Sequence, residues 1–302
     1  MTLMMAVGVF AVRGGIVDKS FVKGFSSLLV NVLIPCMAFS VMVKNYEASA
    51  LSTSLEMMLG CIGVLAVGTF VGLAAHKLRG KKDDLSFLLL PSVIFMNANI
   101  LGFPVIESLY GEQALIYANF FMIPFRPFFY TVMPLLIRGR SSEDRFSPAK
   151  DIFHALLSPS ICATLLGLVV ALCGIKLPAP LFSAVDRLGS TVSSLGMVAC
   201  GMYISSVSFS AAISNRQSWL VVLCRNILSP ALTLALFLAV GVSEDICRLC
   251  VIFAAMPVAS MTALFAGQYG RNSALAASSV FLSTSSSMLT IPLWSLLLEK
   301  II

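Results

Sequence analysis

The sequence predicts an all-α polytopic membrane protein with ten transmembrane helices, arranged as two inverted five-helix repeats. Hydrophobic residues make up 58% of the 302 residues and charged residues 11%, against about 45–50% and about 25% in soluble domains. Long apolar runs recur along the chain, and its longest hydrophilic stretch lies at the midpoint. So few charges cannot cover a water-facing surface, which excludes a soluble enzyme, a secreted disulfide scaffold and a disordered chain.

Apolar runs define the predicted helices, because a spanning helix needs about 20 residues. The first run, 1–12, is short, so either this helix is thin or the true start lies upstream. Counting it gives ten helices. The other nine runs are long enough to span, at 21–43, 53–76, 85–108, 113–137, 152–173, 182–205, 217–241, 246–267 and 274–298.

Lysine and arginine orient these helices. If successive loops alternate between two sides, 13 of the 20 Lys and Arg lie in loops on one side and four on the other, and three lie inside helices. Basic loops face the cytoplasm, so both termini are expected outside a plasma or inner cell membrane. The same rule explains the net charge of +6, and no nucleic-acid partner is expected.

The hydrophilic stretch at 138–151 divides the chain into two halves. Residues 1–137 form the first predicted five-helix repeat, residues 138–151 a cytoplasmic linker, and residues 152–302 the second repeat. Because five is odd, the second half enters the membrane from the opposite side. Such inverted repeats are a common plan of secondary transporters.

Proline interrupts the fourth helix of each half at matching places. Pro104 and Pro257 lie about half the chain length apart. Proline lacks an N–H and clashes with the carbonyl four residues earlier, so the carbonyls of Ile100 and Phe253 should lose their helical partners. Gly102 and two asparagines weaken the first of these helices further. Paired broken helices indicate a transport site at the membrane midplane.

Amides and helix ends are the groups expected to bind an anion there. Helix N-termini offer free N–H donors and partial positive charge, and Asn97 and Asn99 add amides. On a regular helix these two side chains diverge by about 200°, so Asn97 is the preferred residue. Asn31, four residues before Pro35, either lines the cavity or caps its own freed carbonyl.

Two arginines lie within apolar runs, where charges are candidates for function. Arg126 lies mid-helix and is expected to face the interior or attract the anion. Arg225 is expected either to snorkel to the cytoplasmic face, which is the preferred reading, or to act as a charge in the transport pathway. No carboxylate is expected near Pro104 or Pro257, so a central proton relay has little support. No cofactor or metal is expected, the coupling ion is open between sodium and proton, and no catalytic motif is present.

The motifs at these positions resemble the auxin efflux carrier family, whose bacterial members include malate or malonate permease-like proteins. The resemblance rests on NANILGFP from Asn97, AAMPVASMTALFAGQYG from Ala254, VNVLIPCMAF from Val30 and SSVFLSTSSSMLTIPL from Ser278. It implies ten helices in inverted repeats, crossing broken helices, and transport of organic anions by alternating access. Asn97 matches the binding amide of the family, and Pro104 and Pro257 match the crossover.

One departure concerns the second broken helix. Family members often carry an amide three or four places after the proline, where this chain has Ser260 and Met261. Ser260 is therefore a weaker polar candidate, and a symmetric site with two amides is in doubt.

The predicted function is secondary transport of a small carboxylate or auxin-like acid through the lipid bilayer. A sodium-coupled symporter of bile-acid-like or amino-acid substrates is the alternative, and a membrane enzyme or a channel fits less well. The sequence does not determine the oligomeric state, and a homodimer is one expectation.

Overall fold

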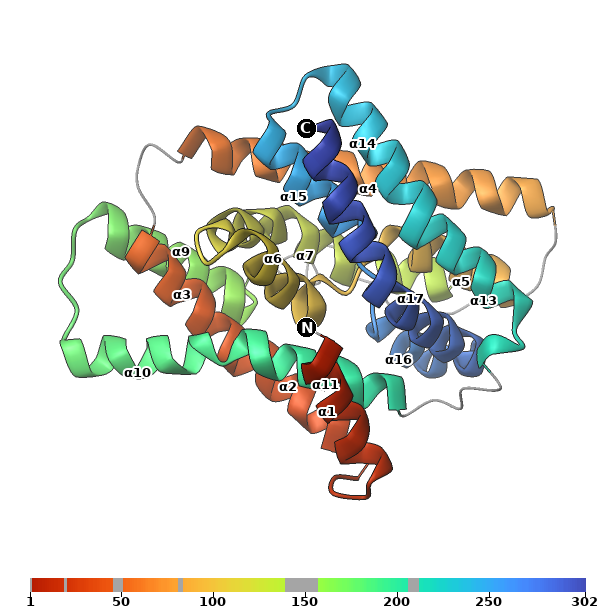
Figure 1. Cartoon of the computed structure of the whole chain (residues 1–302), viewed down its shortest axis with the longest axis horizontal. Helices are drawn as coiled ribbons and strands as arrows, with labels where there is room; N and C mark the ends of the chain where they lie inside the picture. Colours follow the sequence, from red (N-terminus) through yellow and green to blue (C-terminus); the bar gives the residue numbers. More distant parts are fainter. Residues whose placement is uncertain (1, 19–20, 46–50, 81–83, 139–156, 206–211) are drawn as a thin grey trace. The chain divides into compact units, whose positions relative to one another are not determined.

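The computed structural model describes residues 2–18, 21–45, 51–80, 84–138, 157–205 and 212–302 (Figure 1). Within these residues every regular element is a helix, and the one β-type contact is an isolated bridge between Met96 and Val258. Among the described helices, four are long and apolar enough to cross a membrane, at 52–79, 114–138, 216–240 and 273–301. The predicted all-α membrane protein is therefore confirmed.

The described helices follow the predicted runs in order. They are α1 Thr2–Arg13, α2 Phe21–Leu28, α3 Ile34–Asn45, α4 Leu51–Arg79, α5 Asp84–Ile94, α6 Phe103–Tyr110, α7 Ala114–Arg138, α9 Pro159–Leu172, α10 Ala179–Ser190, α11 Val192–Ser205, α13 Arg216–Val222, α14 Ser229–Val240, α15 Glu244–Ala255, α16 Met261–Gln268 and α17 Ser273–Ile301. Several runs contain two helices rather than one. The predicted linker lies almost wholly outside the described residues, and the inverted repeat stays a prediction.

Three π-helical turns share one feature, because each ends within two residues of a proline. Proline cannot donate a backbone hydrogen bond and displaces the carbonyl four residues before it, and a widened turn is one way for a helix to absorb that change. The turns are η1 Leu29–Leu33 before Pro35, η3 Ala98–Gly102 before Pro104 and η4 Leu223–Leu228 before Pro230.

The chain divides into two compact units, each built from both halves of the sequence. The first unit comprises residues 1–59, 99–126 and 153–206. Within it α1 packs on α11, and α3 packs on α9 and α10. At the first contact, a Cβ on Gly8 would collide with the carbonyl oxygen of Val198. Small residues that let two backbones approach closely are typical of helix contacts in membranes.

The second unit comprises residues 60–98, 127–152 and 207–302. Here α17 packs on α13, α15 and α16, and α14 packs on α15. The part of α4 in this unit presents glycines to its neighbours: a Cβ on Gly60 would lie 2.6 Å from Cys250 Sγ, and one on Gly68 would lie 3.2 Å from Ile94 Cα. This close packing surrounds the two broken helices of the unit.

Candidate functional site

Two helices of the second unit stop abruptly and continue as extended chain. α5 ends at Ile94, and α15 ends at Ala255. Met256, the residue that follows α15, has φ −61° and ψ 147°. Proline pushes its preceding residue into this extended region, so Pro257 explains why α15 ends where it does. After the extended segment, α16 begins at Met261.

The two extended segments pair with each other. The Asn97 N–H donates to the Pro257 carbonyl at 2.8 Å, and the Ala259 N–H donates to the Phe95 carbonyl at 3.1 Å. Met96 and Val258 form the antiparallel bridge between these bonds. Each break therefore satisfies backbone groups of the other, as exposed backbone at membrane depth requires.

The first break lies earlier in the sequence than Pro104 alone predicts. The chain leaves the helix at Phe95, and Pro104 sits in the first turn of α6, after the N-cap residue Gly102. The π turn η3 leads directly into α6, and this widened turn accommodates Pro104, which cannot donate to a carbonyl of the preceding turn. The interruption of both helices was predicted correctly, but the position of the first break depends on its pairing with the segment around Pro257.

Arg225 lies at the centre of this arrangement and is fully buried. Its Nε donates to the Met256 carbonyl at 2.8 Å, and its Nη2 donates to the Phe253 carbonyl at 3.1 Å. Its Nη1 donates to the carbonyls of Val93 at 2.7 Å and Ile94 at 3.4 Å. The expectation that Arg225 snorkels to the cytoplasmic face is therefore wrong, because backbone carbonyls of both broken helices hold its guanidinium group inside the unit.

Asn226 connects the same region to α17. Its side-chain Nδ2 donates to the backbone carbonyl of Ser283 at 2.9 Å. The backbone carbonyl of Asn226 accepts from Trp294 Nε1 at 2.9 Å. Ser283 Oγ in turn accepts from the Val258 N–H at 3.1 Å. Asn226, Ser283 and Trp294 were not among the predicted site residues. The signal for Asn226 was present, since it lies four residues before Pro230 and its carbonyl is the one that proline frees.

The predicted residues of this unit are Asn97, Pro257 and Ser260. The Asn97 side chain is 7% exposed, and its backbone is fixed by the bond to Pro257. Ser260 is half-buried and is the N-cap residue of α16, without a side-chain capping bond. The site therefore offers an amide and the N-terminus of a helix, both of which favour a negatively charged ligand.

Other predicted residues belong to the first unit. Gly102 and Pro104 are buried at the start of α6, and a Cβ on Gly196 of α11 would lie 2.7 Å from both Pro104 Cγ and the Ile100 carbonyl oxygen. Asn31 is exposed and donates to Ser27 Oγ at 3.1 Å, not to its own carbonyl. The side chain of Asn99 lies outside the described side chains.

Two charged residues of the first unit are buried to different degrees. Arg126 is 2% exposed and its Nη1 lies 3.4 Å from Ser158 Oγ, so it faces the protein interior. Glu107 lies one turn after Pro104 in α6, is half-buried, and hydrogen-bonds Ser193 of α11. The expectation that no carboxylate lies near Pro104 is therefore wrong.

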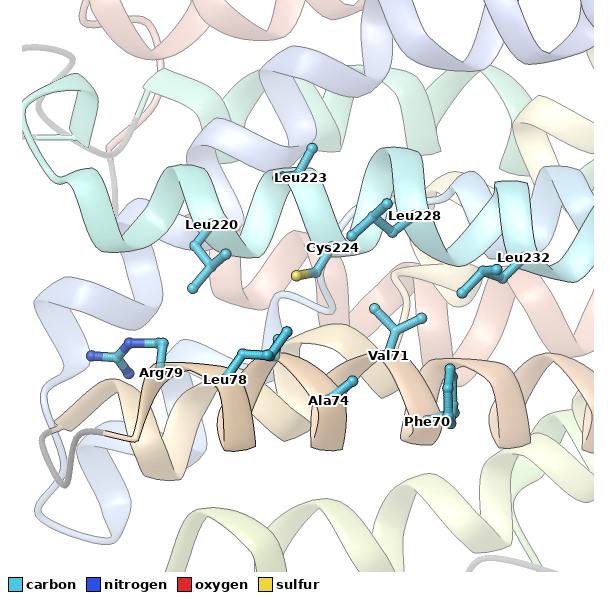
Figure 2. A pocket seen from close by; sticks show the side chains of 11 residues that line it. Phe70, Val71, Ala74, Leu78, Arg79, Leu220, Leu223, Cys224, Leu228 and Leu232 are labelled. Atoms are coloured by element: carbon cyan, nitrogen blue, oxygen red, sulfur yellow. The ribbon is translucent and has the colours of Figure 1, made fainter.

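An apolar groove of about 400 Å³ lies between α4 and the helix formed by α13, η4 and α14 (Figure 2). Side chains such as Val71 and Ala74 line one wall, Leu220 and Leu232 line the other, and Arg79 stands at one end. This apolar lining suits a hydrocarbon chain rather than a carboxylate. The groove therefore differs from the candidate site in the kind of ligand that it favours. Among the described residues, no three His, Cys, Asp or Glu side chains gather to hold a metal ion.

Long apolar helices together with two broken helices that pair at buried depth define a membrane protein of the transporter class. The sequence profile of the family described as "Membrane transport protein" matches residues 1–295. The chain belongs to this family, and the resemblance to the auxin efflux carriers is confirmed. Like its relatives, the protein is a transporter and not an enzyme.

Two relatives match almost end to end. An "uncharacterized transporter" of Methanocaldococcus jannaschii is 25% identical over 309 residues, covering 98% of this chain and 96% of the relative. An "uncharacterized transporter" of Methanothermobacter thermautotrophicus is 24% identical over 288 residues, covering 94% and 91%.

Proposed function

We propose that the protein is a secondary transporter of small organic anions, such as malate, malonate or auxin-like acids. Transport proceeds by alternating access at a crossover near the membrane midplane. In this proposal ten helices form two inverted five-helix repeats, and both termini face outside the cell membrane. The sodium-coupled symporter of bile-acid-like or amino-acid substrates is the alternative.

The pairing of the two broken helices in the second unit carries this proposal. Asn97 N–H bonds to the Pro257 carbonyl, and the extended segments run antiparallel. Broken helices of this kind place helix ends and unwound backbone beside the substrate in secondary transporters. The family assignment supports transport as the function, and the chemistry of the crossover supports an anion as the substrate.

The electrostatics of the crossover favour a carboxylate over a cation. The N-terminus of α16, where Ser260 is the N-cap residue, contributes partial positive charge. The Asn97 amide can donate to a carboxylate oxygen, and hydrogen bonds to charged groups are stronger than those between neutral groups. We expect this amide to be the main side-chain contact of the substrate.

Replacing Asn97 tests the assignment. Asn97→Ala should abolish carboxylate transport in proteoliposomes and weaken binding roughly ten- to a hundredfold, because a hydrogen bond to a charged group is worth about 1.5–3 kcal/mol. Asn97→Asp keeps the size and should weaken binding further by repelling the anion. The measurement is a thermal-shift screen against malate, malonate, 2-oxoglutarate, indole acetate and amino acids, with uptake assays for the ligands that bind.

Asn119→Ala is the matched control. Asn119 is also a buried asparagine, but its amide donates to the Leu115 carbonyl within α7. This variant should keep the substrate affinity of the wild type. Unchanged transport by Asn97→Ala, with folded protein in the membrane, would contradict the site assignment.

A further inference from the structure

The acceptors around Arg225 are the C-terminal ends of two helices. Val93 and Ile94 are the last residues of α5, and Phe253 lies in the last turn of α15, with Met256 directly after it. The carbonyls at a helix C-terminus lack helical partners and carry about half a negative charge. Two such ends therefore converge on one guanidinium group.

Two helix C-termini favour a cation at this point. Unpaired carbonyls and negative helix ends buried away from water are costly. In secondary transporters with broken helices, half-helix C-termini and unwound carbonyls are the groups that coordinate a coupling sodium ion. Here the carbonyls of Val93, Phe253 and Met256 are already bonded to Arg225, at 2.7, 3.1 and 2.8 Å.

We propose that Arg225 is a built-in cation that takes the place of a coupling sodium ion between the ends of α5 and α15. This inference rests on the proposed function and deepens it, because it makes the carrier independent of sodium. The anion then crosses without a sodium partner, and the sodium-coupled alternative is disfavoured. The positive charge stays part of the chain through the transport cycle instead of being released.

The surroundings of Arg225 hold this charge in place. Asn226, the next residue, donates to the Ser283 carbonyl of α17, and Ser283 Oγ accepts from Val258 in the extended segment. The guanidinium therefore projects from a turn anchored to α17. Arginine suits this position better than lysine because its planar fork offers five donors in fixed directions, whereas lysine offers three on a flexible stem.

The first test measures the thermal unfolding midpoint of the purified wild-type protein in sodium, potassium or choline chloride at constant ionic strength. The inference expects the same midpoint in all three salts. A saturable rise in sodium alone would overturn it. No substrate is needed, so this test stands even if no carboxylate is transported. Loss of the proposed function would appear separately, as the absence of carboxylate binding and uptake.

The second test removes the built-in cation. Arg225→Ala should lower the midpoint by something on the order of 10 °C, because a buried charge network loses one partner. Low-millimolar guanidinium should restore part of that loss, and sodium should now stabilise the variant relative to choline. A variant with wild-type stability, or one that responds to no cation, would overturn the inference.

Two further variants complete the design. Arg225→Lys keeps a charge with fewer donors, so it should fold with an intermediate midpoint and should not respond to sodium; a sodium response equal to that of Arg225→Ala would count against the inference. Arg271→Ala is the control, because Arg271 also bonds carbonyls at a helix end, those of Ile137 and Arg138, but at a position that is only partly buried. It should show no guanidinium rescue. If Arg225→Ala does not fold, the wild-type salt comparison and Arg225→Lys decide.

Discussion

At the residue scale, two adjacent polar side chains in one apolar helix bond different elements of the second unit. Arg225 bonds the carbonyls at the ends of α5 and α15, and Asn226 bonds α17. Neither bond is local in sequence, since the partners of Arg225 include residues more than 100 positions away. Both residues belong to the π turn η4, which orients them toward the interior.

Gly196 provides a residue-scale prediction in the first unit. A Cβ at this position would lie 2.7 Å from both the Ile100 carbonyl oxygen and Pro104 Cγ. Gly196→Ala should therefore force α6 and α11 apart and lower stability by about 1–3 kcal/mol, as overpacking of a close contact does. The measurement is the thermal unfolding midpoint in detergent.

Gly24→Ala is the comparison for this variant. Gly24 lies on the exposed face of α2, and a Cβ there would meet nothing within 4 Å. Alanine in a helix interior is favoured over glycine by about 0.5–1 kcal/mol, so this variant should be neutral or slightly more stable. Equal unfolding midpoints for Gly196→Ala and Gly24→Ala would contradict the loss of stability expected from the close contact at Gly196.

At the element scale, proline determines both the π turns and the carbonyls that need another partner. Pro257 frees the Phe253 carbonyl, which accepts from Arg225. Pro230 frees the Asn226 carbonyl, which accepts from Trp294. In each case a side chain from another helix donates to the carbonyl that proline frees. The Phe253 carbonyl also accepts from the Met256 N–H at 3.1 Å. The helix breaks and the contacts between helices are therefore linked.

The two tryptophans of the chain allow a matched test of this link. Trp294→Phe removes the donor to the Asn226 carbonyl and should cost about 1–3 kcal/mol, because a buried acceptor is left unpaired. Trp219 Nε1 donates to the Ile213 carbonyl at an exposed position. Trp219→Phe should therefore cost much less, since water can replace the lost donor. Thermal unfolding of both variants is the measurement, and equal losses would argue against the role assigned to Trp294.

At the scale of the whole molecule, the packing units do not follow the two halves of the sequence. Each unit takes segments from before and after the midpoint. The division falls within α4 after Leu59 and within α7 after Arg126, and it separates Ala98 from Asn99. The two repeats, 1–137 and 152–302, stay a prediction, whereas the units describe how the described helices pack.

The predicted orientation of the chain is tested at this scale. Because 13 of the 20 Lys and Arg lie in loops on one side, that side should be cytoplasmic. A cysteine introduced at Ser141 in a cysteine-free variant should resist a membrane-impermeant thiol reagent in intact cells, whereas a cysteine added after Ile302 should react. The reverse labelling pattern would overturn the predicted orientation.

Properties of the sequence alone predict a membrane protein built of helices and indicate its family. Low charge and repeated apolar runs require a bilayer, since these properties sum over many residues and do not depend on which helices touch. Proline positions likewise indicated the two interrupted helices, because proline acts on its own backbone within four residues. The preference for Asn97 followed from these local rules and stays a prediction.

The position of the buried Arg225 charge depends on packing between segments that are distant in the sequence. From the sequence, the Arg225 side chain could either snorkel to the membrane surface or be buried. Which of the two occurs depends on hydrogen-bond acceptors that lie far away along the chain. Folding brings the ends of α5 and α15 to the guanidinium, and their carbonyls satisfy it better than distant water would. The position of the first break, Phe95 rather than Pro104, was decided in the same way, by pairing with a segment from the other half of the sequence.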